Sequence, residues 1–466
     1  MDHTVAEKQN PVAKKKTYDI FQDVITQFPS LNGYTHIVRA FETSHSISRD
    51  DYVAALQMAF NKLCSNISWL SHQVTVVDTG PGTSGFVKSV PRPDSTPPNT
   101  VVRVDKDEDF PSFATLVATE GFASTFDPAN IFGLPARHGF SLGHVCAIRA
   151  VFIQGGVLVI MTTHNNMIDG IGMMQLWIHL STLMNGGKLS AKAIQLGNAD
   201  RSCVLPLLPP GAPIKNYNHL IRPNPWPLPP PPSAEWCVFH ATRAGVADIK
   251  ARATPIPTPA VPSISSSDAL SAFCWQRVCT VRLRSGKCRA DQISQFRRAA
   301  SGRWAMGLTS DYMGPMMVHA RTWLPMGEVV KSPLARIASL LRRDLEEWRD
   351  EWSVRSCATF MAGVPDKSQL LYGGMTNPET DLSGTSLLRF ARSEPFRMGV
   401  LGESKMFCEV DAPMLPGCLC FYPADNARDV QITMCLTSED IDGLDEDTEW
   451  RRYVRHLGWG LDRFRL

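Results

Sequence analysis

A proline-rich stretch near the middle of the chain limits what the chain can fold into. Eleven of its 34 prolines lie between Pro206 and Pro232, and the stretch ends in four consecutive prolines. Proline has no backbone N–H to donate, so this segment is predicted to be a semi-rigid linker and not an element of a core. A proline-rich docking ligand is the alternative interpretation.

The linker leaves about 200 residues on either side, which is the usual size of one domain. We therefore expect two domains. The predicted organisation is a flexible polar tail at residues 1–16, an N-terminal domain at 17–205, the linker at 206–234 and a C-terminal domain at 235–466.

The composition is that of a soluble globular protein, with 44% apolar and 20% charged residues. The formal net charge is only +2, from 47 basic and 45 acidic side chains, which argues against nucleic-acid binding. Apolar runs such as Gly156–Met161 are far shorter than the roughly 20 residues that span a bilayer, so no membrane insertion is expected. The N-terminus lacks the apolar region of a secretory signal. These features predict a cytoplasmic protein.

Twelve cysteines are scattered from Cys64 to Cys435, and none of them forms a CxxC pair. This pattern predicts neither a zinc site nor a disulfide framework, so no metal is expected and the compartment is predicted to be reducing.

Hydrophobic periodicity predicts the elements of the N-terminal half. Residues Ser48–Leu70 read as an amphipathic helix, and Val74–Val77 as a strand. Two β-rich runs within Val145–Thr163 surround a Gly-Gly turn and predict a hairpin. A helix is expected from Ile171 to Met184, and Gly186-Gly187 should stop it.

The C-terminal half mixes strands and helices in an irregular order, which predicts an α/β protein with mixed sheets. The expected strands are 236–240, 419–422 and 430–436, and the expected helices are 267–278, 335–352 and 445–456.

The stretch His164–Gly170 joins a predicted strand to a predicted helix. A polar turn at a strand end can present a catalytic base to a cleft, and a glycine after it lets a ligand approach the backbone. A solvated turn that merely opens a helix, with Asp169 near its N-cap, is equally compatible with these residues.

A resemblance to a known family favours the catalytic interpretation. BAHD acyltransferases have the motif HxxxDG on such a turn, and the Asp169-Gly170 pair matches its end. Further stretches resemble family motifs in the same order: Ala55–Val74, Asp268–Trp275, Gly302-Arg303, Asp311–Gly314 and Gly417–Pro423 followed by Val430–Leu436. The chain is identified as a member of the fungal secondary-metabolite branch, which contains trichothecene 3-O-acetyltransferase-like enzymes.

The resemblance implies two chloramphenicol-acetyltransferase-like domains, joined by the proline-rich crossover. It implies transfer of an acyl group, with acetyl expected, from acyl-CoA to a hydroxyl or amine of a terpenoid or polyketide. No permanently bound cofactor is implied, and the family default is a monomer.

The resemblance also implies roles for single residues. Asp169 should turn away from the reacting atoms and pair with Arg303, while Gly170 should leave room for the thioester. Phe396 and Gly399 match part of a second motif that shapes the cleft, so a structural role is expected for both. The basic residues expected to bind CoA are Arg282, Arg284, Lys287 and Arg289.

Position 165 departs from the family, because Asn165 stands where the motif has its catalytic histidine. An amide has no useful basicity, and His164 is one position too early, on the opposite face of an extended strand. Three explanations are compatible with this: a deliberate His→Asn replacement, a remodelled turn in which His164 is the base, or a natural variant that uses another base or none.

Two other functions remain compatible with the motifs. A condensation or cyclisation enzyme shares the turn but takes its thioester from a carrier protein. A catalytically inactive protein that binds a metabolite would also explain Asn165.

Overall fold

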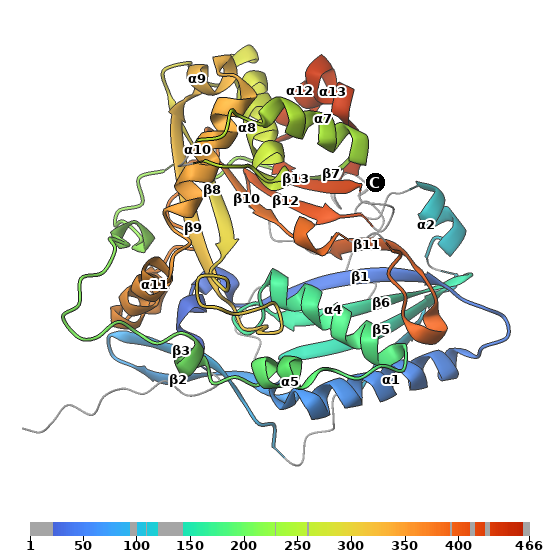
Figure 1. Cartoon of the computed structure of the whole chain (residues 1–466). Helices are drawn as coiled ribbons and strands as arrows, with labels where there is room; N and C mark the ends of the chain where they lie inside the picture. Colours follow the sequence, from blue (N-terminus) through green and yellow to red (C-terminus); the bar gives the residue numbers. More distant parts are fainter. Residues whose placement is uncertain are drawn as a thin grey trace, which may run out of the picture.

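The computed structural model describes residues 22–93, 100–108, 110–119, 143–228, 230–258, 261–391, 394–410, 415–424 and 429–459. The predicted tail at residues 1–16 lies outside these ranges. Figure 1 shows two layered halves, each built from a sheet with helices packed against it, so the expected α/β class with mixed sheets is confirmed.

The N-terminal half is built on a five-stranded sheet of order β11-β1-β6-β5-β4, with a separate β2–β3 hairpin. Its strands are β1 (Tyr34–Glu42), β2 (Gln73–Gly80), β3 (Thr83–Val90), β4 (Val102–Asp105), β5 (Cys146–Ile153) and β6 (Gly156–His164). Its helices are α1 (Arg49–Asn66), α2 (Phe113–Thr119), α4 (Gly170–Met184), α5 (Ala191–Gly197) and α6 (Arg201–Val204).

Strand β6 is buried along its whole length and separates two cores. Its odd-numbered residues Val157, Val159 and Met161 pack with α1 and α4, whereas Leu158 and Ile160 pack with α2. This alternation is the period of two that a strand imposes on its side chains.

The C-terminal half is built on a seven-stranded sheet of order β14-β7-β13-β12-β10-β8-β9. Its strands are β7 (Glu235–Ala241), β8 (Ile293–Ser301), β9 (Met317–Pro325), β10 (Leu382–Ser386), β12 (Cys418–Pro423), β13 (Val430–Leu436) and β14 (Val454–Trp459). Its helices are α7 (Arg243–Ala253), α8 (Ser266–Arg284), α9 (Met326–Lys331), α10 (Leu334–Glu346), α11 (Glu351–Gly363), α12 (Ser438–Glu446) and α13 (Thr448–Tyr453).

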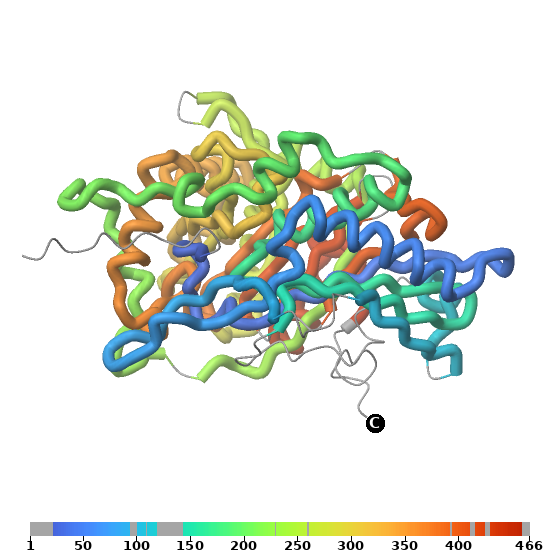
Figure 2. Tube along the Cα trace, turned by 90° about the horizontal axis from the view of Figure 1, so that it is seen from below, coloured from blue at the N-terminus to red at the C-terminus, as the bar shows by residue number. Residues whose placement is uncertain are grey.

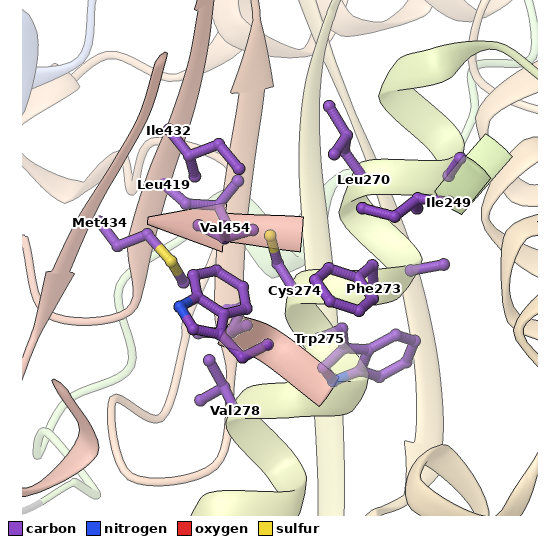
Figure 3. Packing of buried hydrophobic residues seen from close by; sticks show 14 of the residues in the cluster. Ile249, Leu270, Phe273, Cys274, Trp275, Val278, Leu419, Ile432, Met434 and Val454 are labelled. Atoms are coloured by element: carbon purple, nitrogen blue, oxygen red, sulfur yellow. The ribbon is translucent and has the colours of Figure 1, made fainter. Parts of the chain in front are cut away.

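Helix α8 is the central helix of this half. Figure 3 shows Phe273 and Trp275 of α8 among buried side chains of the sheet, which include Leu419 and Ile432. A capping box of Ser265 and Asp268 fixes the start of the helix.

The two halves are interlocked. Strand β11 (Ser404–Val410) comes from the C-terminal half of the sequence but pairs antiparallel with β1, at the edge of the N-terminal sheet. A single boundary at residue 235 therefore does not separate the chain into two independent units. Figure 2 shows the crossover in green along the outside of the molecule, and the only regular element among its described residues is a short 3-10 turn at Asn218–Leu220.

Most predicted elements of the N-terminal half are confirmed, including the capped helix α1 and the β5–β6 hairpin. The single helix predicted at 335–352 is wrong: α10 ends at Glu346, and a new helix starts where the Asp350 carboxylate accepts from the N–H of Ser353. The helix predicted at 445–456 is also wrong. Asp447 caps the short helix α13, and the chain then joins the sheet as β14.

All twelve cysteines are free thiols. Within the described ranges, no helix is long and apolar enough to cross a membrane.

Candidate active site

The turn predicted to be reactive lies where β6 ends and α4 begins. His164 is the last residue of β6 and pairs with Tyr34 of β1. Helix α4 starts at Gly170 because the Asp169 carboxylate caps it by accepting from the N–H of Gly172, at 2.8 Å. Five residues therefore connect a fully buried strand to a buried helix.

Asp169 and Arg303 form a bidentate ion pair, as predicted. Arg303 Nη2 donates to Asp169 Oδ1 at 2.8 Å and Nη1 donates to Oδ2 at 2.9 Å, and Arg303 is completely buried. The N–H of Met316 adds a bond to Oδ2 at 3.2 Å. Because all of these contacts are made within the protein, Asp169 fixes the shape of the turn.

Arg303 also holds the loop that follows it. Its Nε donates to the carbonyl of Tyr312 and its Nη2 to the carbonyl of Gly314, each at 2.8 Å. The stretch Asp311–Gly314 is thus joined to the turn through one guanidinium group, which accounts for the two motifs occurring together.

A second anchor comes from the start of the chain. Asn166 donates through Nδ2 to the carbonyl of Thr26, and Thr26 Oγ1 donates to the carbonyl of Asn166 at 2.9 Å. Both residues are buried. The turn is therefore held in place at both Asn166 and Asp169.

His164 is buried beneath the turn and is only 1% exposed. Its ring meets Tyr34 edge-on, with 5.0 Å between the centroids, and the N–H of Asn166 points at Nδ1 over a long 3.4 Å. Burial lowers the pKa of His164 to about 4, so the imidazole is neutral at physiological pH.

Asn165 lies on the opposite face of the extended chain and is partly exposed. Its Oδ1 accepts from Thr35 Oγ1 at 2.6 Å, and its N–H donates to the carbonyl of Gly33 at 2.9 Å. Asn165 contacts Thr35, whereas His164 contacts Tyr34. Because these two neighbours on β1 point to opposite faces of the strand, Asn165 and His164 also point in opposite directions. The expected opposite orientation of the two side chains is confirmed, and the identity of the base stays a prediction.

The two glycines after the turn differ in what they allow. A Cβ at Gly172 would lie 2.2 Å from the carbonyl oxygen of Met313, so this glycine lets α4 approach that loop. A Cβ at Gly170 would meet only Leu387, at an ordinary 3.6 Å. Packing therefore requires Gly172, whereas Gly170 leaves free space beside the turn.

A cavity of about 400 Å³ opens against the first turn of α4. Ile171 forms one wall, Ser265, Ser266 and Ser267 at the start of α8 form another, and Ser301 lies close to Arg303. Its size is that of a small-molecule site. The start of a 19-residue helix adds backbone N–H groups and a positive dipole end to this wall.

The cavity carries a surplus of positive charge. Arg298 and Arg342 share the carboxylate of Asp268, and Arg349 pairs with a glutamate of α10 at 3.3 Å. Among the described residues no carboxylate pairs with Arg389, whose guanidinium lies 4.1 Å from the centre of the Trp304 ring. Burial and the nearby guanidinium groups lower the pKa of Arg389. Such a cavity favours an anionic ligand.

Comparison with known proteins assigns this arrangement to a family. The model of the trichothecene 3-O-acetyltransferase-like N-terminal domain matches residues 33–183. The O-acetyltransferase SAT5 of Stachybotrys chartarum is 49% identical over 453 residues, which are 96% of this chain and 98% of the relative. The O-acyltransferase pigD of Monascus ruber is 35% identical, over 94% of this chain and 98% of its own length. The chain belongs to this family of fungal acyltransferases.

Solved structures agree with this assignment. The Fusarium sporotrichioides trichothecene acetyltransferase in complex with coenzyme A and T-2 is 25% identical, with a TM-score of 0.85 over 95% of this chain and all of that one. Vinorine synthase shares the fold, with a TM-score of 0.63 at 14% identity over 96% of this chain and 95% of that one. As a family member, this acyltransferase transfers an acyl group from acyl-CoA to a hydroxyl of a fungal metabolite. The carrier-thioester and metabolite-binding alternatives are not favoured.

The structure separates the predicted CoA residues of this acyltransferase from the cavity. They lie at or beyond the C-terminal end of α8, and 19 helical residues span about 28 Å. Arg282 is buried against Asp440 at 2.9 Å, and Lys287 contacts the same carboxylate at 3.4 Å. Arg284 donates to a backbone carbonyl, and Arg289 pairs with the acid two residues on. A role of these four residues in CoA binding stays a prediction, and all four side chains already have partners within the protein.

Phe396 and Gly399 occupy packing positions, which agrees with the structural role expected of them. Phe396 meets Trp177 edge-on, and the guanidinium of Arg39 lies 3.8 Å above its ring. Gly399 has φ +51°, and a Cβ there would lie 2.3 Å from the carbonyl oxygen of Met184. These residues attach the loop before β11 to the end of α4.

Proposed function

We propose that the arginine-lined cavity at the start of α8 receives acyl-CoA, with acetyl as the acyl group, and that the alcohol reaches the turn from the other side. The observation that carries this proposal is the position of the cavity. Its wall at Ile171 directly follows Gly170, and Ser301 lies next to the arginine that fixes Asp169. A ligand in the cavity therefore lies against the back of the turn.

The chemistry of the wall suits the parts of coenzyme A. Its phosphates would meet Arg298, Arg342, Arg349 and Arg389 and the first N–H groups of α8. Trp304 is 44% exposed and already stacked by Arg389, so its ring offers a flat face to an adenine.

The turn would then hold the reacting atoms. Asp169 and Arg303 would act as positioning residues, because their buried ion pair keeps the turn in shape. The free space at Gly170 would admit the thioester, and backbone N–H groups beside it would stabilise the developing oxyanion.

The remaining assignments rest on the resemblance and on composition. A terpenoid or polyketide is the acceptor that we infer, and the working unit is a monomer. The free thiols support a cytoplasmic location, because cysteines stay reduced there.

Two arginines provide a matched test of the cavity. Arg389→Ala removes a guanidinium with no carboxylate partner among the described residues, whereas Arg284→Ala removes an exposed one at the far end of α8. Titration calorimetry should show acetyl-CoA binding about tenfold more weakly to the first variant, because one charged contact contributes roughly 1.5 kcal/mol. Binding to the second variant should be unchanged. Equal losses, or a loss only in Arg284→Ala, would contradict the proposed cavity.

A further inference from the structure

Two side chains of the turn, Asp169 and His164, could in principle take a proton from an alcohol, and neither is suited to do so. The Asp169 carboxylate accepts from both Nη atoms of Arg303 and from two backbone N–H groups. Its lone pairs are used in keeping the turn in shape. Asp169 therefore has no free site at which to receive the proton of a substrate.

His164 is also unsuitable as a base. It is buried on the face away from Asn165, and its Nδ1 faces the N–H of Asn166, so we assign the ring proton to Nε2. Burial disfavours the imidazolium that would form if the ring took up a second proton. In this conformation the ring lies on the buried face, away from Asn165, and does not gain from becoming charged.

Asn165 is the remaining side chain, and its orientation is fixed. The Thr35 hydroxyl occupies its Oδ1, so the two hydrogens of Nδ2 point elsewhere, and no described residue accepts from them. On the same face Thr163 is fully buried, and its Oγ1 has no hydrogen-bond partner within the described part of the chain. Thr35, Thr163 and Asn165 therefore share one face of the strands. The last polar group on this face is the Asn165 amide, which can donate hydrogen bonds but cannot accept a proton.

We propose that this acyltransferase acylates acidic hydroxyls, namely phenols and enols, which lose their proton to water and react as oxyanions held by the Asn165 amide. The proposal rests on the proposed function, since it takes the turn as the place of reaction. The amide then acts as a hydrogen-bond donor to the attacking oxygen, and Thr35 is the residue that positions it.

Magnitudes explain why the acidity of the acceptor matters. A phenol has a pKa of about 10, as in tyrosine, so roughly 1% is ionised at pH 8. An aliphatic alcohol, with an acidity near that of water at about 15.7, is ionised about a million-fold less. A base normally contributes about 10²–10⁴ to the rate, and a phenol replaces that contribution through its own ionisation.

The reaction balances without a protein base. The acceptor gives its proton to solvent, and the oxyanion forms a C–O bond to the thioester carbonyl carbon. The C–S bond then breaks, and the CoA thiolate leaves and takes a proton from solvent. The products are the aryl or enol ester and free CoA.

The experiment compares two acceptors of one shape, 2-naphthol and its fully saturated alcohol, in a thiol-release assay with acetyl-CoA. For the unmodified protein, kcat/KM should be at least about 10³ higher with the naphthol than with the saturated alcohol. Below the pKa of the naphthol, kcat/KM should rise about tenfold per pH unit and level off at that pKa. A naphthol with an electron-withdrawing substituent should move the break to lower pH.

Variants assign the effect to the amide. Asn165→Ala should lower kcat with the naphthol by about 10²–10³, as the loss of one oxyanion donor does elsewhere. Thr35→Val should lower kcat about fivefold with the KM for acetyl-CoA unchanged, and Thr35→Ser should restore it. Asn165→His should instead gain activity toward the saturated alcohol. Its pH profile should then be set by a titrating group of the enzyme and no longer by the pKa of the acceptor.

Several results would overturn the proposal. One is equal turnover of both acceptors, with a pH dependence that breaks near the pKa of a histidine and disappears in His164→Gln. Another is turnover by Asn165→His alone, which would mean that Asn165 only disables the enzyme while the proposed function stands. If neither the unmodified protein nor any variant turns over either acceptor while acetyl-CoA still binds, the acceptor proposal is wrong. If acetyl-CoA does not bind either, the proposed function is wrong.

Discussion

The Asp169 carboxylate and the Arg303 guanidinium lie 134 residues apart in the chain and form a doubly hydrogen-bonded ion pair that is shielded from solvent. The pair joins the N-terminal half, which carries the turn, to the C-terminal half, which carries the cavity. One contact thus fixes the shape of the turn and its position relative to the proposed CoA site.

Removing the Arg303 guanidinium should strongly lower the free energy of unfolding. In Arg303→Ala a buried carboxylate keeps only its backbone donors, and breaking a buried pair in this way costs about 3–5 kcal/mol. Urea unfolding should show this loss in the free energy of unfolding. Arg303→Lys keeps the positive charge but not the bidentate guanidinium, so its loss in free energy of unfolding should be smaller than that of Arg303→Ala.

A surface pair serves as the control. Arg336 and Glu328 are both more than half exposed, so Arg336→Ala should change the free energy of unfolding by about 1 kcal/mol or less. A similar small change in Arg303→Ala would show that the buried pair does not hold the halves together.

The two glycines of α4 should respond differently to one methyl group. Gly172→Ala would place a Cβ 2.2 Å from a backbone oxygen, and such overpacking costs about 1–3 kcal/mol. Gly170→Ala meets only a leucine side chain at 3.6 Å, so it should fold normally but fill the space proposed for the thioester. Melting temperatures and initial rates should therefore separate the two variants, and a normal rate in Gly170→Ala would argue against the thioester lying there.

Local signals in the sequence predicted the scaffold of the site. The capping box at Ser48, the Gly-Gly turn between β5 and β6 and the glycines after α4 are all contained in a few consecutive residues. The Asp169–Arg303 pair is a long-range contact that sequence spacing could not reveal, and only the resemblance to a family predicted it.

The cavity was missed for a physical reason. Its basic wall comes from β8, α10, the turn after α10 and the segment after β10, so no stretch of sequence looks basic there. The density of charge near Arg282 drew the prediction instead, but Asp440 of α12 pairs with both Arg282 and Lys287 of that cluster. The density of basic residues in a stretch of sequence does not give the net charge of a site, because that charge depends on which acidic and basic side chains the fold brings together.

Acid should weaken the fold through His164. The folded pKa is about 4 and the unfolded value about 6.5, so above pH 6.5 both states are neutral and the group has no effect. As the pH falls from 6.5 to 4, the unfolded state binds a proton that the folded state does not. The free energy of unfolding should therefore fall, by on the order of 3 kcal/mol from this group.

The contribution of His164 can be isolated with His164→Gln, which keeps a polar side chain that does not titrate. Urea unfolding at pH 7.5 and pH 5 should show a smaller loss of stability in the variant than in the parent chain. Identical losses would mean that His164 is accessible to protons in the folded state, and would also reopen its role as a base.

The interlocked halves should not fold apart. Residues 22–205 alone lack β11, which leaves the edge of β1 unpaired, and they lose Phe396, Phe407 and Tyr422 from the core around α1 and α4. Each buried apolar side chain of this kind contributes about 1.5–3 kcal/mol, so the fragment should show no cooperative unfolding transition. Cutting the intact protein in the exposed linker near Pro210 should have a different result, because every contact of β11 is retained. The two pieces should then elute together in gel filtration and separate only in denaturant. Independent folding of the fragment, or separation of the cut halves in buffer, would show that β11 is a dispensable edge strand.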